Sequence, residues 1–125
     1  MIFLPLIKRI GMTNIKRGDI WLANLDPTIG SEIRKTRPVV VISNDVNNAN
    51  NSVVTVLPIT SNVSRVFSFE VFFPEGTANL PKDSKAKADQ IRTLDKSRLA
   101  KQIGSLPSHF LLLIETAVKK HLHFI

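Results

Sequence analysis

The chain has 125 residues, of which 43% are hydrophobic and 22% are charged, and these proportions are typical of one globular domain with its own core. It contains no cysteine, which excludes disulfide bridges and thiolate metal sites. Lys and Arg number 17 against 10 Asp and Glu, giving a net charge of +7 that is spread evenly along the chain. This excess favours a polyanionic partner, with nucleic acid as the leading candidate.

The first 11 residues, MIFLPLIKRIG, differ from the rest of the chain. Their apolar part is too short for the core of a signal peptide or for a membrane span, so we expect no membrane association. Met12 opens the segment MTNIKRGDIW, which has the form of a natural protein start. We therefore predict that residues 1–11 are an N-terminal extension upstream of a true start at Met12, and that residues 12–125 form a single domain.

Short apolar runs, alternating or continuous, predict β-strands over most of the chain. The first is Asp19–Asn24, in which Ile20 and Leu22 face one way and Trp21 and Ala23 the other. Further strands are predicted at residues 39–43, 53–59, 67–73 and, as one or two strands, 84–94. Polar segments predict loops at residues 25–36, 44–52, 60–65 and 77–83, and residues 95–99 fit a single helical turn.

The C-terminal region has a different pattern, in which apolar residues recur at helical spacing. The residues of this stripe are Phe110, Leu113, Ile114, Ala117, Val118 and His121. They predict an amphipathic helix over residues 107–122. Several short strands followed by one packed helix predict a mainly β (α+β) fold, with a small, strongly bent sheet or partial barrel.

Arg37 lies where a polar loop runs into the apolar segment Val39-Val40-Val41-Ile42. Such a segment is typical of a buried strand, and Pro38 favours an extended backbone at the residue before it. We therefore expect Arg37 to be held at the edge of a rigid element. A guanidinium held in this way can bind two oxygens of a phosphate group.

A second polar cluster, Thr60-Ser61-Asn62, follows the third predicted strand. An arginine and a threonine at strand ends together suit phosphate binding, because the hydroxyl adds a further donor or acceptor. Glu32 or Asp26, in the loop before Arg37, is close enough in sequence to orient the guanidinium. The alternative is that Arg37 forms a salt bridge with a carboxylate and that Thr60 merely ends its strand.

Three segments carry a family resemblance: GDIWLANLDPTIGSEIRKTRPVVVIS, then PITSN, then DQIRTLDKSRL. Together they resemble the MazF/PemK/Kid family of toxins that cut mRNA independently of the ribosome, over the chain from about Lys16 onward. The resemblance implies an SH3-like or CcdB-type partial barrel that forms a homodimer, with single-stranded RNA in a groove across the interface. It also implies a cytoplasmic protein neutralised by a cognate antitoxin with an acidic, partly disordered tail.

The resemblance further implies a sequence-specific endoribonuclease that needs no metal or other cofactor. The 2′-hydroxyl attacks the adjacent phosphate and leaves a 2′,3′-cyclic phosphate and a 5′-hydroxyl. The catalytic arginine and threonine of the family correspond to Arg37 and Thr60, and the glutamate of its GSE motif corresponds to Glu32. We expect Arg37 to stabilise the transition state and Glu32 to be the candidate base, because a guanidinium remains protonated near neutral pH.

Further site residues are expected in the loops that flank this pair and in the QIRTLD segment. The expected RNA-binding residues are Ser31, Arg34, Lys35, Ser61, Asn62 and Arg65. The residues expected to support the site or the dimer interface are Asp26, Gln90, Arg92 and Asp95. Ile33-Arg34-Lys35 departs from the family pattern, in which a polar residue and a glycine are more typical, and this bears on which RNA sequence is accepted.

Two other classes of function stay open. A gyrase-poison-like toxin on the same barrel would be non-enzymatic and would need no Arg/Thr pair, and a nucleic-acid-binding module would bind without turnover. His109, His121 and His123 all lie in or after the predicted helix, so we expect a core or surface role for them and no metal site. Trp21 and Phe67 have the ring systems to stack on bases, but their strand context predicts that both belong to the core.

Overall fold

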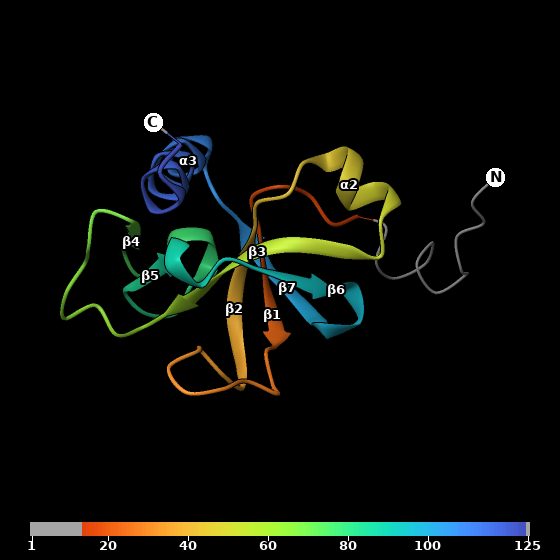
Figure 1. Cartoon of the computed structure of the whole chain (residues 1–125), viewed down its shortest axis with the longest axis horizontal. Coiled ribbons are helices and arrows are strands. Elements are labelled where there is room, and N and C mark those ends of the chain that lie inside the picture. Colours follow the sequence, from red (N-terminus) through yellow and green to blue (C-terminus); the bar gives the residue numbers. More distant parts are fainter. Residues whose placement is uncertain (1–13, 125) are drawn as a thin grey trace.

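The computed structural model describes residues 14–124. The predictions of an extension over residues 1–11 and of a start at Met12 lie outside this part of the chain. Figure 1 shows a strongly bent sheet with helix α3 (Ser108–Leu122) packed beside β4 (Glu70–Phe73), and this confirms the predicted mainly β fold with a C-terminal helix. Within the described residues, neither helix combines the length and the apolar character needed to cross a membrane.

The remaining elements are short. The other strands are β1 (Asp19–Asn24), β2 (Thr36–Val41), β3 (Val53–Thr60), β5 (Ser84–Lys87), β6 (Arg92–Asp95) and β7 (Leu99–Ser105). Helix α2 covers Asp45–Asn50, and single 3-10 turns are η1 (Thr77–Asn79), η2 (Ala88–Gln90) and η3 (Lys96–Arg98). The predicted strand Asp19–Asn24 has the bounds expected, and the helical turn predicted within residues 95–99 is η3.

The sheet is antiparallel and runs in the order β4-β5-β3-β2-β1-β7, with β6 also paired to β3. Strand β2 pairs with one edge of β3, while β6 and β5 share its other edge. β6 pairs with residues 53–56 and β5 with residues 59–60, so the sheet changes partner halfway along β3. One edge of β3 therefore carries two neighbours in succession, and the sheet as a whole is strongly bent (Figure 1).

The bent sheet buries side chains on both of its faces. In β1, Ile20 packs into a core beneath α3, whereas Trp21 and Ala23 pack into a second core on the opposite face. Val40 and Val39 of β2 divide between the two cores in the same way. The predicted alternation is therefore present, but both faces are apolar because each one is covered.

One segment predicted as a loop, residues 44–52, contains helix α2. Its N-cap is Asn44, whose side chain accepts a hydrogen bond from the amide of Asn47 at 2.8 Å. The buried Asn48 side chain donates to the carbonyl of Ser43 at 2.8 Å and accepts from the Ser43 hydroxyl at 2.5 Å. The prediction was wrong because polar side chains, with no apolar stripe, hold this helix.

Strand β7 was not predicted at all. Its sequence, LAKQIGS, is mostly exposed and lies at the edge of the sheet against β1. An edge strand of this kind does not need the apolar alternation that identifies a half-buried strand. The backbone pairing with β1 is therefore what defines it.

Two expectations about apolar side chains were also wrong. The strand predicted at residues 67–73 begins only at Glu70, which leaves Phe67 exposed outside the core. On α3, Leu113 and His121 are exposed, while Leu111, one turn before Ile114, packs against the core. Trp21 is buried as predicted.

Candidate active site

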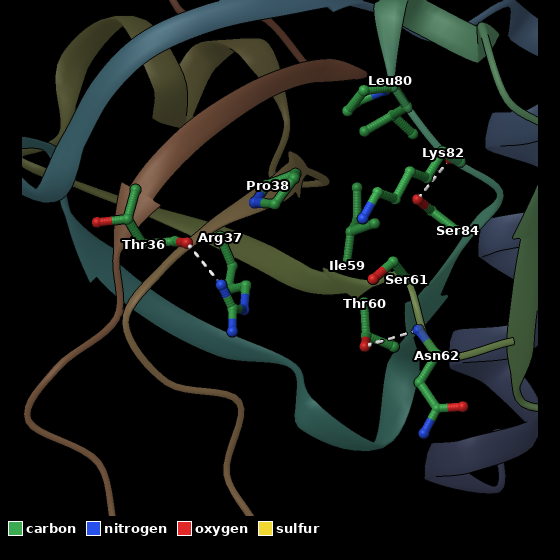
Figure 2. Close-up of a pocket in the computed structure, with 11 residues that line it drawn as sticks. Thr36, Arg37, Pro38, Ile59, Thr60, Ser61, Asn62, Leu80, Lys82 and Ser84 are labelled. Carbon is green, nitrogen blue, oxygen red and sulfur yellow. Dashed lines mark hydrogen bonds between the residues drawn. The ribbon is translucent and has the colours of Figure 1, made fainter.

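Arg37 and Thr60 lie at adjacent ends of β2 and β3. These strands pair with Val39 opposite Pro58, and the same register continued by two residues sets Arg37 opposite Thr60. Opposed residues of an antiparallel pair project from the same face, and Figure 2 shows both side chains on one side of the strands. Both line one cavity of about 360 Å³.

The lining of this cavity is rich in cationic and hydroxyl groups. Its members are Thr36, Arg37, Pro38, Ile59, Thr60, Ser61, Asn62, Leu80, Pro81, Lys82 and Ser84. No carboxylate is among them, so the two cations face four hydroxyls and an amide. This set of groups matches a phosphate ligand, which needs positive charge and several hydrogen-bond donors.

The guanidinium of Arg37 is exposed and is not neutralised by the protein. Its Nη1 donates to the carbonyl of Thr36 at 3.3 Å, and it forms no ion pair within residues 14–124. The backbone at Arg37 belongs to β2, so the side chain starts from a fixed point and remains free at its charged end. The alternative of a salt-bridged Arg37 does not fit this geometry.

Thr60 ends β3 with its hydroxyl directed into the cavity. The Oγ1 atom accepts a hydrogen bond from the amide of Asn62 at 3.2 Å, which orients it. Because that amide uses a lone pair of the oxygen, the hydroxyl proton is left to donate to a ligand. Thr60 therefore contributes a donor beside the Arg37 guanidinium.

Lys82 is a member of the cavity that the sequence analysis missed. Its side chain extends across the cavity toward Ser61 (Figure 2), and within the described part of the chain it has no ion-pair partner. The Ser84 hydroxyl donates to the carbonyl of Lys82 at 2.9 Å and fixes its backbone. A basic loop, PKDSKAK, was the available signal in the sequence, but only the fold brings it opposite β2.

Two smaller cavities share lining residues with the first or with each other, and we refer to the three together as the groove. A cavity of about 180 Å³ shares Thr60 and Asn62 with it and adds Ser31, Ile33, Lys85, Lys87 and Gln90. A cavity of about 250 Å³ then shares Gln90 and adds Glu32, Asp89, Ile91 and Arg92. Of the predicted RNA-binding residues, Ser31, Ser61 and Asn62 line this groove, whereas Arg34, Lys35 and Arg65 lie outside its lining.

The loop before Arg37 is held in place by the QIRTLD segment. The Gln90 side chain accepts from the amide of Ile33 at 2.7 Å and donates to the carbonyl of Ser31 at 3.1 Å. Arg92 donates to the carbonyl of Leu25 at 3.2 Å, at the start of the same loop. The two side chains therefore fix the loop that forms one wall of the groove.

The structure does not bring Glu32 to Arg37. The Glu32 carboxylate accepts a hydrogen bond from the amide of Ile29 at 2.6 Å, within its own loop, and lines the cavity of Gln90. Asp26 accepts from the hydroxyl of Thr28 at 3.3 Å, also locally. Neither carboxylate orients the guanidinium in this conformation.

Asp95 and the histidines lie apart from the groove. The Asp95 carboxylate accepts from the amide of Ser97 at 2.9 Å and caps η3. His109 and His121 project from α3, and His123 ends it. Within residues 14–124, no three histidine, aspartate or glutamate side chains are gathered as they would be around a metal ion.

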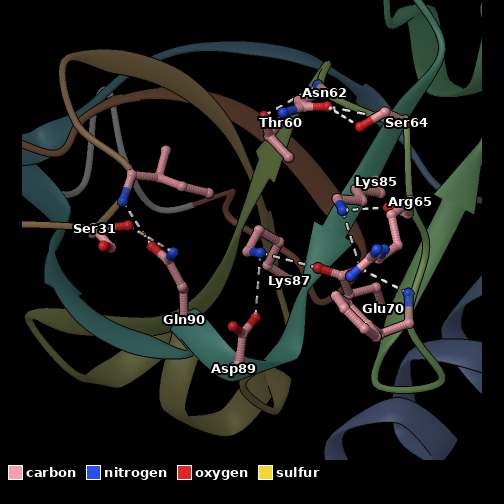
Figure 3. A network of polar contacts seen from close by, with 12 residues as sticks. Ser31, Thr60, Asn62, Ser64, Arg65, Glu70, Lys85, Lys87, Asp89 and Gln90 are labelled. Carbon is pink, nitrogen blue, oxygen red and sulfur yellow. Dashed lines mark hydrogen bonds and ion pairs between the residues drawn. The ribbon is translucent and has the colours of Figure 1, made fainter.

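A buried carboxylate, Glu70, lies beneath the groove (Figure 3). Its side chain is 0% exposed, and it forms ion pairs with Lys85 at 3.0 Å and Lys87 at 2.9 Å. It also accepts a hydrogen bond from the amide of Phe67 at 2.8 Å. Burial raises the pKa of Glu70, but the hydrogen bonds from Phe67, Lys87 and Lys85 outweigh it and leave the pKa below its ordinary value.

The fold and the groove together define a small antiparallel barrel with a cationic, hydroxyl-lined cavity at its strand ends. Residues 16–122 match the family described as PemK-like, MazF-like toxin of type II toxin-antitoxin system, and the chain belongs to this family.

Two curated relatives support the assignment. The chain is 42% identical over 113 residues to endoribonuclease MazF9 of Mycobacterium tuberculosis, covering 86% of this chain and 96% of the relative. It is 37% identical over 105 residues to endoribonuclease MazF of Staphylococcus epidermidis, covering 83% of this chain and 88% of that protein.

Solved structures share the fold. MazF from Deinococcus radiodurans is 26% identical and superposes with a TM-score of 0.76, covering 87% of this chain and 96% of that one. The structure of MazE–MazF from the same organism also matches at 26% identity, with a TM-score of 0.72 over 89% of this chain and 97% of the other.

Proposed function

We propose that the protein is a sequence-specific, metal-independent endoribonuclease toxin that cleaves single-stranded RNA in the groove around Arg37 and Thr60. The observation that carries the proposal is the meeting of an unneutralised guanidinium with several hydroxyls in one cavity that lacks a carboxylate. Membership of the toxin family and two relatives named as endoribonucleases support it.

In the proposed reaction the 2′-oxygen of one nucleotide bonds to the adjacent phosphorus, and the bond from phosphorus to the 5′-oxygen breaks. The 2′-hydroxyl loses its proton and the departing 5′-oxygen takes one up from solvent, so the products are a 2′,3′-cyclic phosphate and a 5′-hydroxyl. Negative charge grows on the phosphate oxygens as the new bond forms, and the Arg37 guanidinium stabilises it with two parallel hydrogen bonds. The hydroxyl of Thr60 donates to the same phosphate and fixes its orientation.

Glu32 remains our candidate for the base that takes the proton of the 2′-hydroxyl. Because its carboxylate binds the amide of Ile29 in this structure, the role requires residues 29–32 to turn toward Arg37 when RNA binds. Glu32→Gln should then abolish the rising, acidic limb of the pH–rate profile. A variant that keeps the wild-type profile would exclude Glu32 as the base.

The other groups of the site bind and support. We propose that Ser31, Ser61 and Asn62 contact RNA within the groove, as they line it. Charged residues of the neighbouring loops would hold the RNA backbone, and these are Arg34, Lys35 and Arg65. Gln90 and Arg92 fix the loop wall, and we retain Asp26 and Asp95 as support for the site or for a dimer interface.

We also propose that two copies of the chain form a homodimer with the RNA groove across their interface. A cognate antitoxin with an acidic, partly disordered tail would compete with RNA for the unpaired cations of this groove. We further propose that the protein acts in the cytoplasm, where mRNA, its proposed substrate, is found.

The decisive experiment is incubation of the purified protein with mixed RNA in EDTA, followed by mapping of the new ends. We expect cuts at one recurring sequence, each with a 5′-hydroxyl and a cyclic phosphate. Arg37→Ala prepared in parallel controls for contaminating ribonuclease. Intact RNA would refute the proposal, and RNA that is bound but not cut would indicate a nucleic-acid-binding module.

A further inference from the structure

An exposed aromatic ring lies beside the groove on the loop between β3 and β4. Phe67 is 45% exposed, although its position in the sequence predicted a place in the core. Its ring stacks on that of Phe69, with 5.3 Å between centroids and an angle of 4° between the planes. The guanidinium carbon of Arg65 lies over the Phe67 ring, 5.4 Å from its centroid.

The backbone that carries this pair is fixed from below. The amide of Phe67 donates to Glu70 at 2.8 Å, and the Lys85 ammonium donates to the carbonyl of Arg65 at 2.5 Å. Lys85 and Glu70 are themselves a buried ion pair, as Figure 3 shows. A ring that is already rigid loses little conformational entropy when a ligand covers it.

The same anchors connect the pair to the groove. Lys85 lines the cavity of about 180 Å³ that also contains Thr60 and Asn62. Beyond Asn62, the loop turns through Ser64, whose hydroxyl donates to the Asn62 side chain at 2.9 Å. Arg65 and Phe67 thus follow Asn62 and Ser64 on one loop, and Lys85 connects the backbone of that loop to the cavity.

The charge beside the ring is available to a ligand. Within residues 14–124, Arg65 forms no ion pair, in contrast to Lys85 and Lys87, which are paired with Glu70. The Phe67 ring remains 45% exposed even with Phe69 stacked on it and the Arg65 guanidinium over it. This exposed aromatic surface and the unpaired charge of Arg65 together match a nucleotide, whose base stacks and whose phosphate is anionic. An aliphatic peptide side chain would not use the flat face in this way.

We propose that Arg65 and Phe67 form a stacking subsite for one nucleobase of single-stranded RNA, outside the cleavage cavity. The base covers the exposed part of the Phe67 ring, and Arg65 binds the phosphate of the same nucleotide. This subsite rests on the proposed function, because it lengthens the RNA-binding groove. It makes Phe67 a determinant of RNA affinity and of the sequence accepted next to the cut.

The test uses the full chain and an RNA oligonucleotide containing the mapped cut sequence, with a 2′-deoxy substitution at the cut that prevents cleavage. A fluorescent 2-aminopurine is placed at each flanking position in turn. At one position the wild-type protein should quench the fluorescence by stacking, and Phe67→Ala should remove the quenching. The variant should also weaken binding by about 5- to 150-fold, the range for loss of one stacked base.

Further variants separate stacking from other causes. Phe67→Trp should bind within about threefold of wild type and Phe67→Leu should be weakened like Phe67→Ala, since only the aromatic ring offers a π face. Leu112→Ala is the matched control, because Leu112 is 64% exposed on the outer side of α3. Leu112→Ala should leave both the affinity for RNA and the cleavage rate at their wild-type values.

Equal affinity of Phe67→Ala and Leu112→Ala for the oligonucleotide would overturn the subsite. It would also be overturned if Phe67→Leu bound like wild type, or if Phe67→Ala altered only association with a protein partner. If the wild-type protein cuts no RNA, the proposed function fails, and the same variants measured on uncut RNA of mixed sequence still test the subsite. The two failures are therefore distinguishable.

Discussion

Four of the cations that line the groove fall into two sets that the protein treats differently. Arg37 lies near the start of β2 and Lys82 lies in the loop before β5. Neither has an ion-pair partner within residues 14–124. Lys85 and Lys87, on β5, form ion pairs with the buried Glu70, and Lys87 also lies 3.8 Å from the carboxylate of Asp89. Net charge alone would have counted all four as sites for a polyanion.

The difference separates binding from scaffold. A cation paired to a buried carboxylate has already exchanged its hydration for the ion pair, and breaking that pair is costly. Lys85 and Lys87 therefore stabilise the pairing of β4 with β5, whereas the charges of Arg37 and Lys82 remain available to a ligand. Substitution of Arg37 or Lys82 should therefore change cleavage or RNA binding, whereas loss of the Glu70 ion pairs should change the stability of the fold.

The largest effect is expected for Arg37→Ala. Loss of a donor aimed at the developing charge should slow cleavage by about 100-fold or more, while the thermal unfolding temperature should stay near that of wild type because the side chain is exposed. Arg37→Lys should recover only part of the rate, because it keeps the charge but loses the two-pronged geometry. Near-wild-type cleavage by Arg37→Ala would contradict the proposed mechanism.

In contrast to Arg37→Ala, the Glu70→Ala variant should chiefly lower the stability of the fold. Removing the carboxylate leaves the buried Lys85 ammonium without an ion pair and Lys87 with only Asp89 at 3.8 Å, and it should cost about 3 kcal/mol in the free energy of unfolding, measured by denaturant titration. Glu75→Ala is the control, since Glu75 is an exposed carboxylate after β4. Equal stability of the two variants would show that the Glu70 ion pairs do not stabilise strands β4 and β5.

Much of this architecture is predictable from the sequence. The alternation in Asp19–Asn24 and the stripe of α3 have the periods of a strand and a helix, so the fold class follows from them. Arg37 and Thr60 were placed at strand ends by the apolar runs beside them. The β2–β3 register that sets them opposite one another was not predictable, because it depends on pairing between distant segments.

The features that were missed depend on other kinds of interaction. Helix α2 is held by asparagine side chains and β7 by pairing at a sheet edge, and neither leaves an apolar pattern. Lys82 enters the cavity only because its loop crosses toward β3. Glu70 lies in an alternating run that predicts a strand, but its two lysine partners come from β5, and no local pattern indicates which lysines will be neutralised.

Lys82→Ala should have a moderate effect confined to RNA binding. Loss of one charged contact to phosphate should weaken binding of uncleavable RNA by about tenfold. It should also reduce the slope of log affinity against log salt by about 1. Lys101→Ala is the matched control, because Lys101 is exposed on β7, away from the groove. If both variants kept the wild-type salt slope, Lys82 would not bind phosphate. The absence of an ion pair would then not distinguish the cations that bind a ligand from those that stabilise the fold.

The smallest effect is expected in the pH dependence of stability. The pKa of Glu70 is lowered in the folded protein, so its ionised form favours folding and contributes fully above the ordinary glutamate pKa of about 4.3. This contribution should be lost as the pH falls through the lowered value, when Glu70 is protonated and its pairs with Lys85 and Lys87 break. In thermal unfolding from pH 7 to pH 3, Glu70→Gln should therefore lose less stability than wild type.

Some loss should remain in Glu70→Gln, because the pKa of Asp45 is also lowered, chiefly by the hydrogen bond from the Arg17 amide at 2.7 Å. Asp45→Asn should remove this remaining loss of stability at low pH, while the loss caused by protonation of Glu70 should persist. Cleavage by Glu70→Gln, assayed at neutral pH, should stay close to the wild-type rate because Glu70 is not part of the cavity that contains Arg37 and Thr60. Parallel pH curves for wild type and Glu70→Gln would mean that the buried carboxylate does not drive the stability of strands β4 and β5, and that its lysines are as available to a ligand as Arg37 and Lys82.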